Sequence, residues 1–358
     1  MKHYQSIIAV LILLFIIKSV SFMQEADNVS LTDGDIEHYL LLAESYTKNV
    51  TMSGRTYQYP PLFPLLLIPA SYMDTVTYIL ILNIILSVLS FFPLYLISIR
   101  HTTFNKSVII AFFVVLINIV FSIKSFGFPI ILSSLLFAWF IYFFQDIRII
   151  RNNLYYSSII YALMIMSKLV FIYMLPFIII SILLFRDDKI KSLIRMSIIP
   201  GTMVCAYLLF NGLQHGFTTR GMIGGYITIL TNDFLAIDIG TIIPKIQSIF
   251  TTLEPNTMMT YYSVFFVVLA MIWGKYKRDE YVIFSLKEID FLILLSFNYL
   301  VFFWFPSMTY SYTYLNWRYI SYFTPVYLVF AFIPLIDVFE SVFNEILRIL
   351  RKLQMKSE

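Results

Sequence analysis

The stretch LTDGDIEHYLLLAESY, residues 31–46, gathers four acidic side chains in a chain in which only 13% of residues are charged. They are Asp33, Asp35, Glu37 and Glu44. A carboxylate held beside a substrate can act as a general base, accepting a proton from an attacking hydroxyl. The simpler interpretation is that acids near a helix start satisfy and complement its exposed backbone N–H groups.

Helical geometry separates the four acids. Thr32 or Asp33 suits the N-cap, and a helix from there places four apolar residues on one face: Ile36, Tyr39, Leu40 and Ala43. Glu37 and Glu44 then lie on the opposite face, whereas Asp35 lies at the edge of the apolar face near His38 and Tyr39. The pattern predicts an amphipathic helix on the membrane surface, with Asp35 as the candidate catalytic carboxylate.

Three basic residues are candidates for binding a phosphate group. Lys168 lies in the apolar run MIMSKLVFIYMLP, Arg318 in the aromatic run YLNWRYISYF, and Arg55 just before YPPLFPLLLIPA. Charges in apolar surroundings are costly unless they are paired, and a guanidinium matches phosphate well. The alternatives are a snorkelling lysine, an interfacial arginine anchor and a solvated loop arginine, respectively.

A divalent metal such as Mg or Mn is a further possibility, with Asp33 and Asp35 as its oxygen ligands. Acids two residues apart are common by chance, and no His/Cys cluster has zinc spacing. Arg220 and Asp233 lie in a second polar segment, HGFTTRGMIGGYITILTNDF, and are candidates to shape an acceptor pocket together with His38 and Tyr39. No basic block with interleaved aromatics indicates nucleic-acid binding.

These residues have to be positioned by a membrane-embedded chain. Of its 358 residues 59% are hydrophobic, and the mean hydropathy is +0.82. Apolar runs of about the length that crosses ~30 Å of hydrocarbon predict an all-α polytopic membrane protein with ten spans. The predicted spans are 6–23, 75–99, 107–123, 127–145, 154–167, 169–185, 193–210, 258–274, 288–305 and 319–337.

The ten spans form one predicted membrane domain, 1–358, without a separate soluble domain. Ten spans with the N-terminus inside put 17 Lys and Arg residues inside and 7 outside, as the positive-inside rule favours. Both termini are then cytoplasmic, and the long loops 24–74 and 211–257 face outside. Merging 154–167 with 169–185 into one broken helix would move every later loop to the opposite side of the membrane.

The first apolar run could also be a signal peptide, but no small-x-small cleavage site follows it, so we expect a retained anchor.

Three motifs in this order resemble those of the GT-C superfamily of polytopic glycosyltransferases, which includes protein O-mannosyltransferases and lipid A aminoarabinose transferases. DGDIEHYLLLAESY with YPPLFPLLLIP resembles the acidic first-loop motif and its Pro-Pro segment. ALMIMSKLVFIYMLPFI resembles the central lysine motif, and RYISYFTPVYLVF the Arg-Tyr…Pro motif of a late span. One departure is Ile36, because many relatives have a glutamate after the aspartate.

The resemblance implies a GT-C-like fold in the plasma membrane and inverting sugar transfer at the outer face from a polyprenyl- or dolichyl-phosphate donor. The acceptor would be a protein, a glycan or a lipid. By position, Asp35 matches the catalytic acid, and Lys168 and Arg318 match basic positions near the lipid phosphate. The chain ends soon after the last span, which favours a monosaccharide transferase over an oligosaccharyltransferase. The alternatives are a lipid or sugar-lipid flippase, and a non-catalytic membrane assembly subunit.

Overall fold

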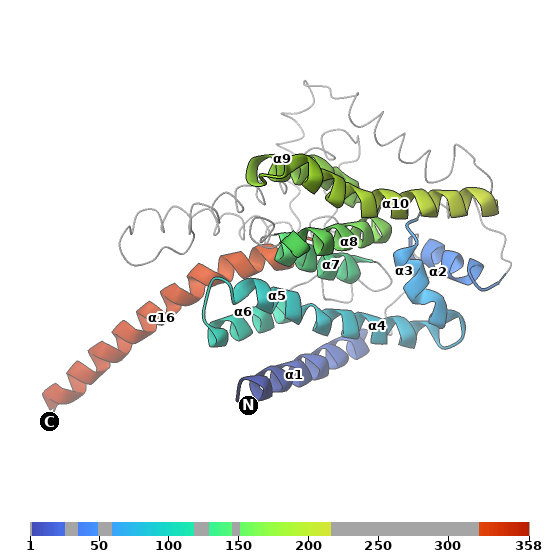
Figure 1. Ribbon diagram of the computed structural model, residues 1–358. Helices are drawn as coiled ribbons and strands as arrows, with labels where there is room; N and C mark the ends of the chain where they lie inside the picture. Colours follow the sequence, from blue (N-terminus) through green and yellow to red (C-terminus); the bar gives the residue numbers. More distant parts are fainter. Residues whose placement is uncertain are drawn as a thin grey trace, which may run out of the picture.

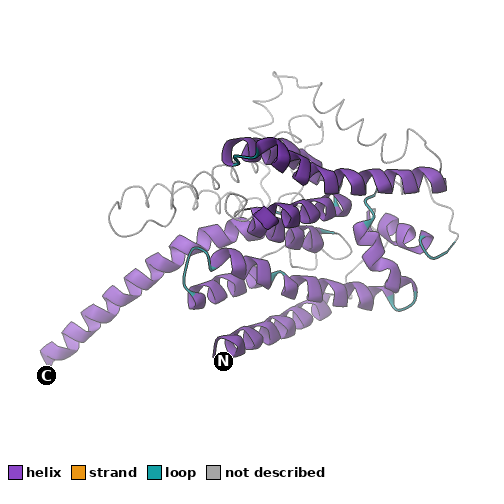
Figure 2. Ribbon diagram, viewed as in Figure 1, coloured by secondary structure: helices purple, strands orange, loops and turns teal. Residues whose placement is uncertain are grey.

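The structure, a computed structural model, describes residues 2–25, 35–48, 59–117, 129–144, 151–215 and 322–357. Every regular element in these ranges is a helix (Figure 2). The helices pack into an elongated bundle whose long members run roughly side by side (Figure 1). The predicted all-α architecture is therefore confirmed for the part of the chain that is described.

The first half of the bundle begins with a long N-terminal helix, α1. Its elements are α1 (Lys2–Glu25), α2 (Asp35–Ser45), α3 (Leu62–Leu67), the 3-10 helix η3 (Ile68–Ser71), α4 (Thr75–Leu89), α5 (Phe91–Ser98) and α6 (Phe104–Ile117). The side chain of Asp74 caps α4 by accepting a 2.8 Å hydrogen bond from the Thr77 backbone N–H. This satisfies one of the N–H groups that a helix start leaves unpaired.

The second half contains the longest helices. Its elements are α7 (Ile130–Phe144), α8 (Arg151–Ser167), the 3-10 helix η6 (Leu169–Met174), α9 (Leu175–Phe185), α10 (Lys189–His215) and α16 (Thr324–Ser357). The predicted spans 258–274 and 288–305 lie outside the described residues. Each of the other predicted spans overlaps a described helix.

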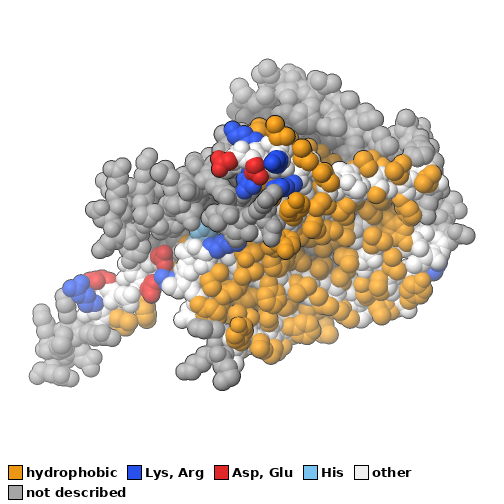
Figure 3. Space-filling model, in the orientation of Figure 1, with side chains coloured by type: hydrophobic (Ala, Val, Ile, Leu, Met, Phe, Trp, Pro, Cys, Tyr) orange, Lys and Arg blue, Asp and Glu red, His pale blue; other side chains and the backbone are white. Residues whose placement is uncertain are grey.

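Four stretches of the described chain are long and apolar enough to cross a membrane. They are Tyr4–Gln24, Thr75–Ser98, Lys189–Phe210 and Thr324–Leu350. Shorter apolar helices lie beside them, among them α6 and α7. The surface between the ends of the bundle is broadly hydrophobic, whereas charged groups gather near the α9–α10 junction and along α16 (Figure 3). The chain is thus built as a membrane protein, and the full count of ten spans stays a prediction.

The course of the chain between α8 and α10 decides between the two interpretations of 154–185. The Ser158 hydroxyl in the middle of α8 donates to the backbone oxygens of Arg195 and Met196 near the start of α10. Met166, at the end of α8, packs against Tyr207 farther along α10. The two helices therefore run parallel, so the segment between them has to return along the bundle. This geometry agrees with two separate segments and not with one broken helix.

The two ends of the bundle carry different kinds of residue. Figure 1 places α2 and α3 at the end opposite to both chain termini. Arg100 belongs to the end where the termini lie, since its guanidinium donates to the Tyr142 backbone oxygen at the end of α7 (2.7 Å) and lies over the Tyr142 ring. The start of α7 lies at the other end, where Ser133 bonds to Ser167 (3.1 Å). Arg100 and the α2–α3 region thus lie at opposite ends of the bundle, and the predicted distribution of basic loops, with the side that faces the cytoplasm, stays a prediction.

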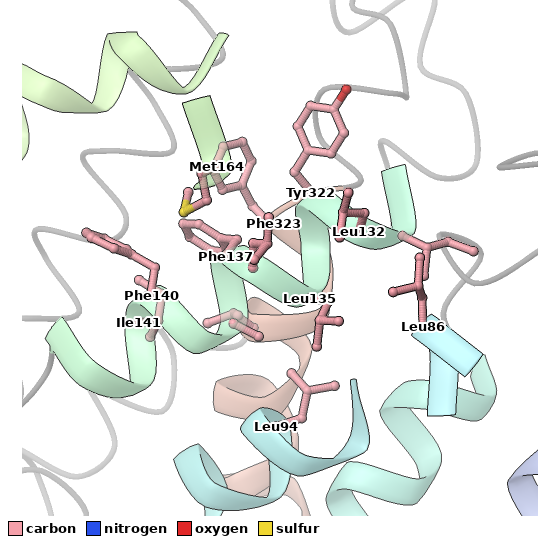
Figure 4. Close-up of a cluster of buried hydrophobic side chains, with 14 of the residues drawn as sticks. Leu86, Leu94, Leu132, Leu135, Phe137, Phe140, Ile141, Met164, Tyr322 and Phe323 are labelled. Atoms are coloured by element: carbon pink, nitrogen blue, oxygen red, sulfur yellow. The ribbon is translucent and has the colours of Figure 1, made fainter. Parts of the chain in front are cut away.

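Aromatic and aliphatic side chains from α4, α5, α7, α8 and the residues just before α16 form a buried cluster (Figure 4). The rings of Phe137 and Phe323 meet edge to face, with centroids 4.6 Å apart. Such pairs stabilise by about 0.5–1.5 kcal/mol beyond the area they bury. Because this cluster joins α16 to α7, it fixes the start of α16 close to the candidate site.

Candidate active site

Lys168 lies where the helical hydrogen-bond ladder is interrupted. Helix α8 ends at Ser167, Lys168 has extended backbone angles (φ −155°, ψ 125°), and η6 begins at Leu169. The Tyr161 hydroxyl donates to the Phe171 backbone oxygen (3.1 Å), although ten residues of straight helix would separate them by about 15 Å. The chain therefore folds back at Lys168, which places the half-buried lysine at a corner of the bundle instead of inside a span.

The ammonium group of Lys168 contacts α2. Its Nζ donates to the Tyr39 hydroxyl oxygen at 3.2 Å and lies 5.8 Å from the centre of the Tyr39 ring. Asp35 is the first residue of α2, one turn before Tyr39. Residues four apart on a helix occupy the same side of it. The contact therefore brings the predicted lysine motif onto the helix that begins with the predicted catalytic acid.

Tyr39 is held in a packed aromatic setting, with none of its surface exposed. Its ring meets the rings of Tyr59 and Phe63 edge to face, at centroid distances of 4.9 and 5.4 Å. His38 stacks on Tyr59 from the neighbouring position, at 5.2 Å. Because the ring is enclosed on several sides, the Tyr39 hydroxyl has a defined position at Lys168.

The helix α2 differs from its prediction in what covers its apolar face. Ile36, Tyr39 and Ala43 are buried against the protein, where α3 and η3 pack on α2. They therefore do not lie on a membrane surface. The physical reason is that a short helix followed by an apolar, proline-rich segment buries its stripe more completely against that segment than against head groups. The predicted helix is confirmed, but the prediction that its apolar face lies on the membrane surface is wrong, because α3 and η3 cover that face.

The Pro-Pro segment supplies the wall on which α2 packs. Pro60 and Pro61 directly precede the short helix α3. Proline is tolerated at a helix start because the first backbone N–H groups have no partner within the helix. The Tyr207 hydroxyl of α10 donates to the Tyr59 backbone oxygen (3.1 Å), and the Tyr78 hydroxyl of α4 donates to the Leu66 backbone oxygen (2.7 Å). This proline-rich segment is thus anchored from two sides, by α10 and by α4.

Tyr46, just after α2, is a neutral phenol at neutral pH, because burial, and secondarily the neighbouring Tyr207, raises its pKa well above the usual range.

The third motif reaches the same region through its described part. Tyr322 is buried with its ring 5.4 Å from that of Phe171, three residues after Lys168. Figure 4 shows the Tyr322 hydroxyl directed away from the hydrophobic cluster. Phe323 contacts Phe171 as well, with centroids 6.1 Å apart. The segment that follows Arg318 by four residues is thus packed against the lysine corner.

Several predicted site residues have no described side chain. Asp33, Arg55, Arg220, Asp233 and Arg318 lie outside the described residues, and of Asp35 only the backbone position at the start of α2 is described. Among the predicted residues, the structure brings together Tyr39, His38 and Lys168. Their roles stay predictions.

Sequence reasoning missed two supports of the site. Tyr59 connects α2 to α10 through its contacts with Tyr39 and Tyr207. In the sequence, the only feature that could have indicated this role is its position directly before Pro60. The hydrogen bond between Ser133 and Ser167 ties the residue before Lys168 to α7. In the sequence, the position of Ser167 directly before a lysine in an apolar run is the feature that could have indicated this support.

Changing Tyr39 to phenylalanine keeps the packed ring and removes the hydroxyl that meets Lys168. We expect kcat to fall about tenfold to a hundredfold, because a misplaced charged group costs that much. The KM for the donor should change little, since the ring wall stays. Steady-state kinetics of the full chain in lipid measures both. Tyr142→Phe, at the far end of the bundle, is the matched control, and an equal loss in both variants would contradict a positioning role for Tyr39.

Comparison with known proteins identifies similar structures but no similar sequences. No protein-family model matches the sequence, and no curated protein sequence matches it. Among solved structures, the chain is similar to the Archaeoglobus fulgidus oligosaccharyltransferase in its apo form, with a TM-score of 0.54 and 14% identity over 97% of this chain and 52% of that one. The same enzyme in complex with Zn and sulfate gives a TM-score of 0.56 and 16% identity, over 93% and 49%.

A third structure is of AglB from the same organism in complex with an inhibitory peptide and a dolichol-phosphate, with a TM-score of 0.54 and 13% identity over 97% and 52%. The fold of the chain is similar to that of the archaeal oligosaccharyltransferase, of whose length the chain spans about half. That enzyme is of the GT-C type, so the predicted GT-C-like fold is supported. At this identity the likeness establishes the fold alone, and the O-mannosyltransferase or aminoarabinose transferase type stays a prediction.

Proposed function

We propose that this chain is a membrane glycosyltransferase that moves a sugar from a polyprenyl- or dolichyl-phosphate donor to an acceptor at the outer face. The observation that carries the proposal is the 3.2 Å contact between Lys168 Nζ and the Tyr39 hydroxyl. It joins a cation suited to a phosphate with the helix that begins at the candidate base, Asp35. The similar archaeal enzyme, solved with a dolichol-phosphate and an inhibitory peptide, supports a lipid-phosphate donor and makes a peptide one of the acceptor classes.

In the proposed reaction, Asp35 accepts the proton of an acceptor hydroxyl while that oxygen attacks the anomeric carbon of the sugar. The new carbon–oxygen bond forms on the face opposite to the breaking bond to phosphate, so the anomeric configuration inverts. Polyprenyl phosphate leaves with the bonding electron pair. A positioned general base typically contributes about 10²–10⁴-fold to such a step.

The basic residues would act on the leaving group. Negative charge grows on the phosphate oxygens as the sugar departs, and a fixed ammonium in a partly dehydrated corner stabilises that charge more than bulk water does. Lys168 would supply this group, and the Tyr39 hydroxyl would hold it in place. Arg318 would contact the same phosphate, because the residues that follow it pack on Phe171, and Arg55 would do so from the segment before Tyr59.

The acceptor would enter beside α2. His38, on the exposed flank of the Tyr59 ring, and Tyr39 belong to this side of the site. Arg220 and Asp233 of the second long loop would shape the remainder of the pocket. The acceptor itself is a protein, a glycan or a lipid in this proposal, and the sugar is a hexose or a pentose.

A divalent metal enters the proposal only as a partner of Asp33 and Asp35. The similar archaeal enzyme was solved in complex with Zn and sulfate, and carboxylate oxygens suit Mg or Mn. The side chains of Asp33 and Asp35 lie outside the described part of the structure. No step of the proposed reaction is routed through a metal.

One observation favours the flippase alternative. Lys18 lies within α1 and is only 6% exposed, and a lysine buried in a span is typical of transport pathways. A flippase would move labelled lipid between leaflets without chemical change, and Lys18→Met would abolish that movement. The glycosyltransferase proposal expects Lys18→Met to leave sugar transfer intact.

The donor class is tested with membranes enriched in the full chain. Polyprenyl monophosphates carrying radiolabelled single sugars are compared with polyprenyl pyrophosphates carrying oligosaccharides, and label is followed into protein, glycan and lipid fractions. We expect transfer from at least one monophosphate donor and none from membranes lacking the chain. Transfer only from the pyrophosphate oligosaccharides would overturn the monosaccharide donor, and lipid translocation without transfer would favour the flippase.

A further inference from the structure

Helix α16 is longer than a membrane span requires. Its 34 residues, Thr324–Ser357, correspond to about 51 Å of helix, whereas the hydrocarbon core of a bilayer is about 30 Å thick. Figure 1 shows its C-terminal part continuing away from the bundle, beyond the other helices. Part of α16 therefore lies outside the hydrocarbon core.

Ion pairs mark where α16 leaves the bundle. Lys106, near the start of α6, contacts Asp337 Oδ1 at 2.6 Å and Glu340 Oε2 at 2.5 Å. Before this point α16 is buried among other helices, as Val326 and Ile333 are. Because three charged groups together are costly in hydrocarbon, they place the membrane boundary near Asp337.

Beyond this boundary, α16 keeps an apolar face that the described protein does not cover. Phe339 is 71% exposed, and further apolar side chains follow it at helical spacing: Val342, Phe343, Ile346, Ile349 and Leu350. At 100° per residue these positions span about 120°, roughly a third of the helix circumference. The remaining surface carries polar and charged residues, among them Glu340, Asn344, Glu345 and Arg348.

The shape and charge of this segment fit a lipid surface. An apolar face of about 120° is wider than the strict two-position seam of a two-helix coiled coil. Toward the C-terminus the sequence of α16 becomes basic, with Arg348, Arg351, Lys352 and Lys356. A broad apolar face, phenylalanines and neighbouring basic residues are the features of interfacial helices that bind anionic membranes. The segment also continues directly from a part of α16 that is itself in the membrane.

We propose that residues 339–353 of α16 bind the surface of an anionic membrane leaflet as an interfacial helix. Pro334, just before Asp337, has no backbone N–H to donate, which eases a bend in α16 at the boundary. After such a bend the face of Phe339 and Ile346 meets the acyl chains, and Arg348 meets the phosphate groups. The proposal concerns membrane attachment and does not depend on the proposed sugar transfer.

The test uses spin labels in the full chain. The native Cys205 is exposed, so Cys205→Ser first removes it from labelling. Single cysteines are then introduced as Ile346→Cys on the apolar face and Asn344→Cys on the polar side. Each labelled protein is reconstituted in vesicles of phosphatidylcholine with or without phosphatidylglycerol, and collisions of the label with oxygen and with a water-soluble nickel complex are measured.

We expect the label at position 346 to favour oxygen and that at position 344 to favour the nickel complex, most clearly with phosphatidylglycerol. Arg348→Gln combined with Lys352→Gln should reduce this contrast in anionic vesicles and leave it unchanged in neutral ones. Equal nickel accessibility at both positions would show a helix in water and overturn the proposal. Strong spin–spin coupling at position 346 would instead show a second copy on this face and overturn it as well.

Discussion

Asp35→Asn is expected to lower sugar transfer by about 10²–10⁴-fold, the contribution of a positioned general base. Asparagine has almost the shape of aspartate but accepts no proton. Asp35 begins α2, so the substitution changes one end of that helix and leaves its buried face intact. The rate is measured with purified full chain in lipid at saturating donor.

Glu37→Gln is the matched control, because it removes a carboxylate from the exposed side of the same helix. Its activity should stay within about twofold of wild type, by the rule that surface changes away from a site are mild. If both variants lose activity equally, the effect comes from the helix N-terminus and not from proton transfer.

Lys168→Gln is expected to lower kcat by about 10²–10³-fold, the usual cost of removing one donor that stabilises charge in the transition state. Glutamine retains a hydrogen-bond donor for the Tyr39 hydroxyl but brings no positive charge to the leaving phosphate. Lys168→Arg should restore part of the activity, because the charge is kept and only its geometry changes. Transfer rates over a range of donor concentrations separate kcat from KM.

Lys48→Gln controls for the loss of a lysine near α2, since Lys48 is half exposed and 3.7 Å from Glu44. A double-mutant cycle adds a sharper criterion. If Tyr39 acts through Lys168, then Tyr39→Phe should have little further effect once Lys168→Gln is present. Full additivity of the two losses would contradict the coupling.

The apolar runs of the sequence predicted the long described helices. The interruption of one run at Lys168, together with the positive-inside count, favoured two segments over 154–185. Hydropathy does not distinguish a helix face that meets lipid from one that meets another helix, since both are apolar. This is why Ile36 and Ala43 were assigned to a membrane surface although α3 and η3 cover them.

The contact at the centre of the site could not be read from the sequence. Tyr39 and Lys168 are 129 residues apart and meet only because the chain folds back after α8 and the Pro-Pro segment holds α2. Motif order suggested that the three regions belong together. The tyrosine hydroxyl as the partner of the lysine is a product of tertiary packing, as is the stacking of Tyr322 on Phe171.

The central claim is that the chain transfers sugar from a lipid monophosphate with Asp35 as base. The most direct measurement follows polyprenyl phosphate release and labelled product together, using purified wild-type chain and Asp35→Asn in the same lipid. The account predicts equal amounts of both products from wild type, inversion at the anomeric carbon, and a loss of about 10²-fold or more in the variant. Transfer by Asp35→Asn at the wild-type rate would contradict it.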